Sequence, residues 1–561
     1  MKKDMKFSAE KNDITVKYIL PVRIIGCDCA QDAEVLLKDL PSQAIRGGEP
    51  ECAVLYKGGY ILLDFGTELA GGIRISVRYI KDDGERENPN PSLRVVFGES
   101  VSEAMSACGE KNFINDHSMR DITREYGFMS TFRVGETGFR FAKIESCDAE
   151  VEILSVKGVF EYRDIPYIGE FSCSDKRLED IWNVGAYTVH LNMQSYLWDG
   201  IKRDRMVWIG DMHPEMLTVC AVFGGNDCVT KSIDIVKNIT PYTEWMNGHL
   251  SYSMWWILLQ RDWYFQNGDR AYLEENRDYL FKLLERAISL IDNDGNFTYD
   301  GHMFVDWSSK NTPYAKTGVI ATVALALKNG AELARILGNE ILADACQEAY
   351  NRIDTDKLSY QGNKQVAALV AVSGLKTARE INETVLSKNP LDGLSTFIGG
   401  YVLEARAQAG DIDGALEVVR KYWGAMLDFG ATTFWEDFDL AWTENASPID
   451  APVPAGKRDI HGDCGKFCYK QFRHSLCHGW ASGPTWFLSR YVLGIRILEP
   501  GCRKLLIKPC LSNLDHVKGK YPTPYGAVEV EHTRDKSGNI KTCVHAPKEI
   551  EVIIADNKIL I

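Results

Sequence analysis

The sequence predicts a multidomain protein in which a helical domain lies between two β domains. Three observations point to this arrangement. The chain has 561 residues, which is more than one compact hydrophobic core accommodates. Apolar residues recur with the period of a strand up to about residue 165 and with the period of a helix from about residue 170. Strand-like runs return after about residue 495, so we place the domains at residues 1–167, 168–494 and 495–561.

The first domain is predicted to be a β-sandwich. Short runs rich in β-branched and aromatic residues alternate apolar with polar side chains, and clusters of Gly, Asp and Pro separate them. Examples are YILLDFG (60–66), IRISVRYI (73–80) and LRVVFG (93–98). Many such strands at short spacing are typical of a sandwich.

The second domain is predicted to consist of helical hairpins. Leu178, Ile181, Trp182 and Gly185 fall on one face of its first helix, with Ser174 as a candidate N-cap. Further helical stretches lie at about 215–238, 251–266, 270–293, 315–337, 339–353, 365–386, 394–409, 412–428 and 474–493. A closed α/α barrel or an open solenoid would satisfy this pattern, and the absence of a repeat of about 34 residues favours the barrel.

The third domain is predicted to be a small β unit that packs on the helices. Its strand-like runs are KLLIKPC (504–510), AVEVEHT (527–533), IKTCVHA (540–546) and IEVIIAD (550–556). Lys536-Ser537-Gly538-Asn539 has the composition of a hairpin turn between two of them. About 65 residues are too few to form an independent core of this kind.

Composition excludes several function classes. The net charge of −14, without a long basic run, argues against a nucleic-acid partner. No run approaches the ~20 apolar residues of a membrane span. The polar N-terminus lacks the apolar region of a signal peptide, and 15 irregularly spaced Cys suit free thiols in a reducing compartment. We therefore expect a cytoplasmic protein that binds neither nucleic acid nor membrane.

Two segments combine carboxylates with large aromatic residues. WDGIKRDRMVWIGDMHPE (198–215) offers Asp199, Asp204 and Asp211 as acid, base or hydroxyl-binding groups, although a structural knot of caps and ion pairs would have the same composition. GATTFWEDFD (430–439) places Glu436 among apolar residues that would tune its pKa, although a buried Glu paired with an Arg would look the same. Together they supply the two carboxyl groups that cleavage of a glycosidic bond requires.

Three motifs resemble those of the family 78 α-L-rhamnosidases. Residues 199–211 resemble the signature D-C-P-x-R-E-R-x-G-W-T-G-D, residues 431–436 resemble A-T-T-x-W-E, and SLCHGW (475–480) resembles S-x-N-H-Y. The flanking segments 62–75 and 171–182 are similar to the family's accessory sandwich and barrel entry. The resemblance implies a central (α/α)6 barrel of the six-hairpin glycosidase type, flanked by an N-terminal β-sandwich and a small C-terminal β domain. Asp204 stands where many members have Glu, and Gly200-Ile201 replaces Cys-Pro.

The resemblance also implies a reaction, the hydrolysis of terminal α-L-rhamnosyl residues with inversion and without a cofactor. Asp204 would act as the general acid and Glu436 as the general base. The residues implied to bind the sugar are Asp199, Arg203, Trp208, Asp211, Trp255, Asp306, Trp307, Trp435 and His478. The expected partner is a rhamnosylated small molecule or oligosaccharide, and the chain could form a homodimer. Two alternatives remain: a six-hairpin glycosidase acting on another deoxy or uronic sugar, and a catalytically lapsed carbohydrate-binding protein.

Two further segments have the composition of a functional site. Cys464, Cys468, His474 and His478 superficially resemble a zinc site, but the spacer between the pairs is about half of what a zinc finger needs, so we expect no metal there. The long irregular segment 437–467 is either a variable surface loop or a rim or lid over the sugar site.

Overall fold

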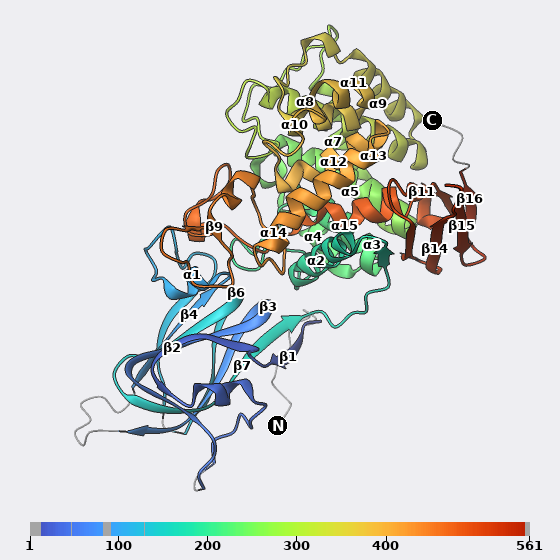
Figure 1. Ribbon diagram of the computed structural model, residues 1–561. Helices are drawn as coiled ribbons and strands as arrows, with labels where there is room; N and C mark the ends of the chain where they lie inside the picture. Colours follow the sequence, from blue (N-terminus) through green and yellow to red (C-terminus); the bar gives the residue numbers. More distant parts are fainter. Residues whose placement is uncertain (1–12, 46–47, 82–90, 128, 556–561) are drawn as a thin grey trace, which may run out of the picture.

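The computed structural model describes residues 13–45, 48–81, 91–127 and 129–555. Residues 1–12, which bear on the expectation that there is no signal peptide, lie outside this range. Figure 1 shows the N-terminal strands at one end of a helical domain and the C-terminal strands packed against the side of the same helices. The order of β, helical and β domains that the sequence predicts is confirmed.

The N-terminal domain is one long sheet that curls over its own core. Its strands hydrogen-bond in the order β1-β7-β3-β6-β4-β5, with β2 added to β3. The register of β3 explains the curl, because Leu55 and Ile80, from its two halves, both pair with Val151 of β7. The bounds are β1 (Thr15–Ile19), β2 (Arg23–Gln31), β3 (Ala53–Lys81), β4 (Ser92–Gly98), β5 (Asp121–Glu125), β6 (Thr131–Ser146) and β7 (Glu150–Tyr162).

The helical domain is a closed barrel of hairpins. Inner helices follow one another in contact, α3 on α5, α5 on α8, α8 on α10, α10 on α12, α12 on α15, and α15 back on α3. This closure rules out the open solenoid. The inner helices are α3 (Met212–Phe223), α5 (Leu250–Asn267), α8 (Ala315–Ile336), α10 (Lys364–Ser373), α12 (Thr396–Gln408) and α15 (Gly483–Phe487).

The outer helices are amphipathic and cover the inner ring. In α4, for example, Cys228, Val229, Ile233 and Val236 are buried while the opposite face is charged. The outer helices are α2 (Lys176–Asn192), α4 (Asp227–Ile239), α7 (Arg277–Ser289), α9 (Glu340–Arg352), α11 (Ala378–Ile381), α13 (Ile412–Val418) and α14 (Gly424–Asp428). The N-cap of α2 is Asp175 rather than the expected Ser174, because its carboxylate accepts a hydrogen bond from the amide of Arg177.

The C-terminal strands form two small sheets on the barrel. One has the order β15-β14-β13-β8, and the other has the order β11-β12-β16. Strand β8 (Glu170–Cys173) comes from the beginning of the helical domain, so it ties the two domains together. The remaining bounds are β11 (Ile495–Glu499), β12 (Lys504–Ile507), β13 (His516–Thr523), β14 (Gly526–Arg534), β15 (Ile540–His545) and β16 (Glu551–Ile554).

Residues 437–467 fill the junction between the sandwich and the barrel. The carbonyl of Ile449 accepts a hydrogen bond from the amide of Val101, and the side chain of Asp450 contacts Arg23.

Among the described residues, no helix is both long and apolar enough to cross a membrane.

Candidate active site

Loops at the sandwich-facing end of the barrel enclose a cavity of about 200 Å³. Of the residues proposed from sequence, Asp199, Arg203, Asp204, Trp208, Asp211, Trp307, Glu436 and His478 line it. The carboxyl groups of Asp204 and Glu436, 232 positions apart in the chain, thus face one space. Asp199, Asp211, Arg203, Glu436 and His478 are almost fully buried at its inner end.

The loop 199–206 is held in a strained, closed conformation. Asp199 closes it, because its amide donates to the carbonyl of Met206 at 3.0 Å and its carboxylate accepts from the amide of Met206 at 3.0 Å. Asp204 and Arg205 have φ values of 56° and 53°, in the left-handed region of backbone conformation that residues other than glycine rarely adopt. Such strain persists only where the surroundings enforce it, and here Arg205 bonds to Glu136 of the sandwich.

Arg203 joins the two candidate catalytic carboxylates. Its Nη1 donates to Oδ1 of Asp204 at 2.7 Å, and its Nη2 donates to Oε1 of Glu436. The guanidinium lies 3.9 Å from the centre of the Tyr469 ring, which fixes its plane. Nε1 of Trp208 donates to the other oxygen of Asp204 at 3.2 Å. The carboxylate of Asp204 is therefore oriented from two sides.

Glu436 is held as a buried carboxylate. The amide of Ser475 donates to its Oε2 at 3.1 Å, and the Cys468 thiol donates to its Oε1 at 2.8 Å. Burial raises the pKa of Glu436, but the charges of Arg203 and His478 outweigh burial and hold that pKa well below its usual range. The group is thus ionised at neutral pH, as a general base must be.

The floor of the cavity is a polar network around Asp211. The hydroxyl of Tyr252 donates to Oδ1 of Asp211 at 2.8 Å, and Nε2 of His478 lies 3.3 Å from Oδ2. Burial lowers the pKa of His478, yet Glu436 and Asp211 outweigh it and the net shift is upward. Burial, with the nearby charges of Asp204 and Asp211, raises the pKa of Asp199 well above its usual range. Such a set of close donors and acceptors suits the hydroxyl groups of a sugar.

Sequence reasoning missed several residues of the cavity wall. Aromatic and basic side chains gather toward its mouth, where Trp307 lies under the ammonium of Lys310 at 4.4 Å and Trp208 stacks on His249. The missed residues are His249, Tyr252, His302, Phe304, Lys310, Tyr469 and Trp480. Trp480 lies within the motif 475–480, and Tyr469 follows the irregular segment 437–467. Their closeness in sequence to these segments could have identified both as cavity residues.

Three proposed sugar-binding residues do not line the cavity. Trp255 is buried among inner helices and donates from Nε1 to the hydroxyl of Tyr401 at 2.9 Å. Asp306 accepts hydrogen bonds from Ser308 and Ser395, and burial raises its pKa to about 6. Trp435 is buried, is not among the residues that line the cavity, and packs against Phe438.

The four residues of the zinc-like string turn to different partners. Cys464 accepts a hydrogen bond from Arg458, and Cys468 donates to Glu436. Nε2 of His474 accepts from the amide of Asp437, and His478 faces Asp211.

Comparisons with known proteins cover both the helical and the C-terminal regions. The model of the bacterial α-L-rhamnosidase six-hairpin glycosidase domain matches residues 166–362, and that of the bacterial α-L-rhamnosidase C-terminal domain matches residues 494–557. An α-L-rhamnosidase of Formosa agariphila is 32% identical over 175 residues, which cover 29% of this chain and 17% of that protein. The chain therefore matches only a minor part of that relative.

Solved structures share the fold of nearly the whole chain. The family 78 rhamnosidase of Bacillus sp. GL1 aligns with a TM-score of 0.73 at 20% identity, over 93% of this chain and 55% of its own. A rhamnosidase from Klebsiella oxytoca, solved with rhamnose bound, aligns with a TM-score of 0.69 at 20% identity, over 86% of this chain and 97% of its own. The resemblance that the three motifs indicate is confirmed: residues 166–362 and 494–557 of this chain match the six-hairpin and C-terminal domain models of the bacterial α-L-rhamnosidases.

Proposed function

We propose that this chain hydrolyses terminal α-L-rhamnosyl residues with inversion, with Asp204 as general acid and Glu436 as general base. The observation that carries the proposal is that the guanidinium of Arg203 hydrogen-bonds to both of these carboxylates beside one cavity. The cavity-lining residues from Asp199 to Lys310 lie in the segment that matches the bacterial α-L-rhamnosidase six-hairpin glycosidase domain. Two separated carboxyl groups are the machinery that glycoside hydrolysis needs.

The depth of the two groups matches their proposed roles. The side chain of Asp204 is 12% exposed and lies toward the mouth, where the leaving group would project. The side chain of Glu436 is 2% exposed and lies deeper, where a single water could be activated against the anomeric carbon. The ionised state of Glu436 suits proton abstraction from that water.

The floor of the cavity favours a neutral sugar. Asp199, Asp211 and Glu436 can bind sugar hydroxyls, and the negative charge of Glu436 would repel the carboxylate of a uronic acid bound at the same position. The rings of Trp208 and Trp480 provide apolar faces for the sugar ring and its methyl group. Rhamnose is the ligand named for the similar Klebsiella structure.

We further propose a cytoplasmic location, supported by the free state of all described cysteines.

The test is turnover of para-nitrophenyl α-L-rhamnoside, with a panel of other aryl glycosides beside it. We expect hydrolysis of the rhamnoside, β-L-rhamnose as the first product by NMR, and near-complete loss in Glu436→Gln. Asp204→Asn should also lose activity, but less than it does on an alkyl rhamnoside, because p-nitrophenolate is a good leaving group. Turnover of a different aryl sugar alone would move the assignment to another glycosidase. Rhamnose binding without any turnover would instead indicate a carbohydrate-binding protein.

A further inference from the structure

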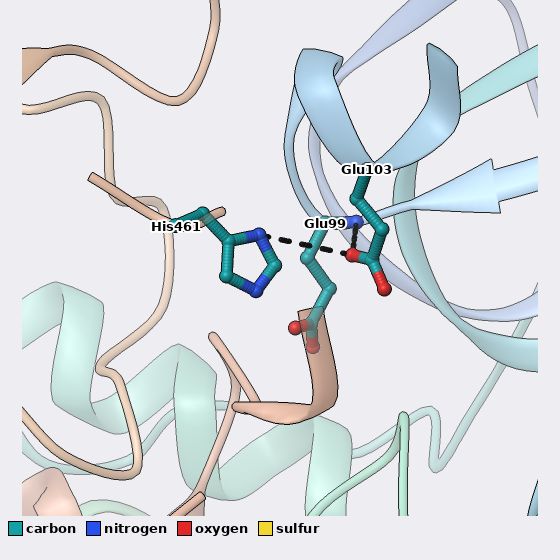
Figure 2. A group of neighbouring side chains, drawn as sticks. All are labelled: Glu99, Glu103 and His461. Carbon is teal, nitrogen blue, oxygen red and sulfur yellow. Dashed lines mark hydrogen bonds and ion pairs between the residues drawn. The ribbon is translucent and has the colours of Figure 1, made fainter. Parts of the chain in front are cut away.

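A buried ionic cluster lies beneath the loop that carries Asp204. Glu99, Glu103 and His461 approach one another closely enough for their ligand atoms to lie within 4.8 Å, as a metal site would require. Figure 2 shows the side chains of Glu99 and Glu103, from the sandwich, facing His461 of the 437–467 segment. The cluster is fully enclosed, since the structure gives Glu99 and Glu103 no exposed surface and leaves His461 1% exposed.

The cation of this cluster is a side chain of the catalytic loop. The ammonium of Lys202 lies 3.1 Å from Oε2 of Glu99 and 2.9 Å from Oε1 of Glu103. The ammonium also donates a hydrogen bond to the carbonyl of His474 at 2.8 Å. The guanidinium of Arg120 adds a second positive charge beside Glu103. Two cations thus face the carboxylates of Glu99 and Glu103.

His461 completes the cluster as a neutral ring. Burial and the charge of Lys202 hold its pKa well below the usual range. Its Nε2 donates to the carbonyl of His474 at 3.0 Å, which leaves Nδ1 to accept from the hydroxyl of Ser100 at 2.8 Å. Both ring nitrogens are therefore used by the protein itself.

Glu99 connects this cluster to both candidate catalytic carboxylates. On one side it pairs with Lys202, which directly precedes Arg203 and Asp204 in the chain. On the other side its carboxylate accepts from the amide of Leu476 at 2.6 Å and from the hydroxyl of Ser475 at 3.4 Å. The amide of Ser475 is the group that donates to Glu436.

We propose that Glu99 of the N-terminal sandwich is a positioning residue that holds the loops of Asp204 and Glu436 in register across the cavity. It touches neither the cavity nor the expected substrate, so it acts through Lys202 and the Ser475–Leu476 backbone. The sandwich then completes the active site of the barrel rather than merely packing on it. The expected loss of turnover rests on the proposed function. The positioning of the two loops by Glu99 does not.

The test compares Glu99→Gln with Asp64→Asn. Gln keeps the shape of Glu99 but removes the charge that faces Lys202. Asp64 is a matched control, because it too is a fully buried sandwich carboxylate, paired with Arg140 and Arg23, and has no contact with residues 199–206 or 474–478 among its partners in the described chain. The readouts are kcat and KM on para-nitrophenyl α-L-rhamnoside, and hydrogen exchange of the backbone amides in those two loops.

For Glu99→Gln we expect kcat to fall ten- to a hundred-fold with a smaller change in KM, since misplacement by about 1 Å is worth about that much. We also expect faster exchange in both loops. Asp64→Asn should leave kcat and the exchange of these loops near wild type, whatever its melting temperature. Glu99→Asp, which keeps the charge, should recover part of the rate and serves as the second variant if Glu99→Gln does not fold.

Unchanged exchange in both loops would overturn the inference, as would equal losses of kcat in Glu99→Gln and Asp64→Asn. Loss of a stoichiometric bound metal from Glu103→Gln, measured by mass spectrometry of the purified proteins, would replace it with a metal site. An inactive wild type would refute the proposed function alone, because the exchange data still decide the role of Glu99.

Discussion

The thiol of Cys468 lies 2.8 Å from Oε1 of Glu436 and donates a hydrogen bond to it. Burial raises the pKa of this thiol well above its usual value, and the charge of Glu436 adds to the shift. At neutral pH the sulfur is thus a neutral donor to the charged carboxylate of the candidate general base. Since only the thiolate reacts quickly with alkylating reagents, this cysteine should be slow to modify.

Slow, pH-dependent inactivation by iodoacetamide is the first prediction. Between pH 7 and 9 the inactivation rate should rise about tenfold per pH unit, because the thiolate fraction does so below the pKa of the thiol. Free rhamnose should protect. Cys468→Ser should retain activity within a few-fold and resist inactivation, although the exposed Cys27, Cys29, Cys108 and Cys543 still react. Inactivation of the Ser variant at the wild-type rate would place the sensitive thiol elsewhere.

Replacement of Arg203 by Met should shift the pH dependence of kcat/KM. Arg203 is the largest of the charges that hold the pKa of Glu436 down, so its removal leaves burial opposed mainly by His478 and that pKa should rise. A base with a raised pKa is protonated at higher pH, and the acidic limb of the profile should therefore move upward by more than one unit. Arg205→Met is the control, because Arg205 bonds to Glu136 and lies over Trp198. An acidic limb that stays in place in Arg203→Met would contradict the proposal that Arg203 lowers the pKa of Glu436.

The effect of Asp204→Asn should depend on the leaving group. A general acid contributes about 10²- to 10⁴-fold where the leaving oxygen must be protonated. We expect about a 10³-fold loss of kcat on an alkyl rhamnoside, and a loss of less than tenfold on dinitrophenyl rhamnoside, whose leaving group departs without a proton. Rates on both substrates, measured at the same pH, give the comparison. Equal losses on the two would assign Asp204 another role.

The fold was predictable where local patterns decide it. Alternation identified segments 60–66 and 93–98 as strands, and they lie in β3 and β4. The stretch 215–238, predicted as one helix, is instead two, because Gly224 adopts a φ of 83° after α3 and Asn226 caps α4. The predicted helix 474–493 begins only after His478, as a 3-10 turn over Gly479–Ser482 that leads into α15, because residues 474–478 form the loop that carries His478.

The motifs predicted the candidate catalytic residues. They did not predict the other residues of the cavity wall or the buried residues that hold the catalytic loops in place. Asp204 and Glu436 stand in recognisable segments, so their common cavity followed from the family resemblance. Trp255 and Trp435 were assigned to the sugar through the family resemblance, and an aromatic residue in a sequence does not show whether its ring lies in the core or in a cavity wall. The pairing of Glu99 with Lys202 joins residues 103 positions apart in two domains, and no local pattern encodes such a contact.

Trp307 should contribute to the binding of the leaving group rather than of the rhamnosyl unit. It is partly exposed at the mouth and lies 5.8 Å from the Tyr469 ring. Trp307→Ala should raise KM for a rhamnosyl disaccharide about three- to tenfold, as expected for the loss of one aromatic contact, with little change in the Kd of free rhamnose. Trp245→Ala is the control, since Trp245 stacks on Arg286 and does not line the cavity. An equal weakening of rhamnose binding would place Trp307 against the sugar itself.

Gly479→Ala should weaken both the fold and the site. A Cβ at this position would lie 1.9 Å from Oε1 of Glu215 and 2.6 Å from Nδ2 of Asn192, both fully buried. Neither neighbour can move into solvent, so the backbone next to His478 must shift. We expect a loss of about 1–3 kcal/mol in the free energy of unfolding by urea, and weaker rhamnose binding by calorimetry. Gly127→Ala, where a Cβ would meet no atom within 4 Å, should change neither quantity. If Gly479→Ala bound rhamnose as tightly as wild type, the close approach of Gly479 to Glu215 would not be what sets the position of His478.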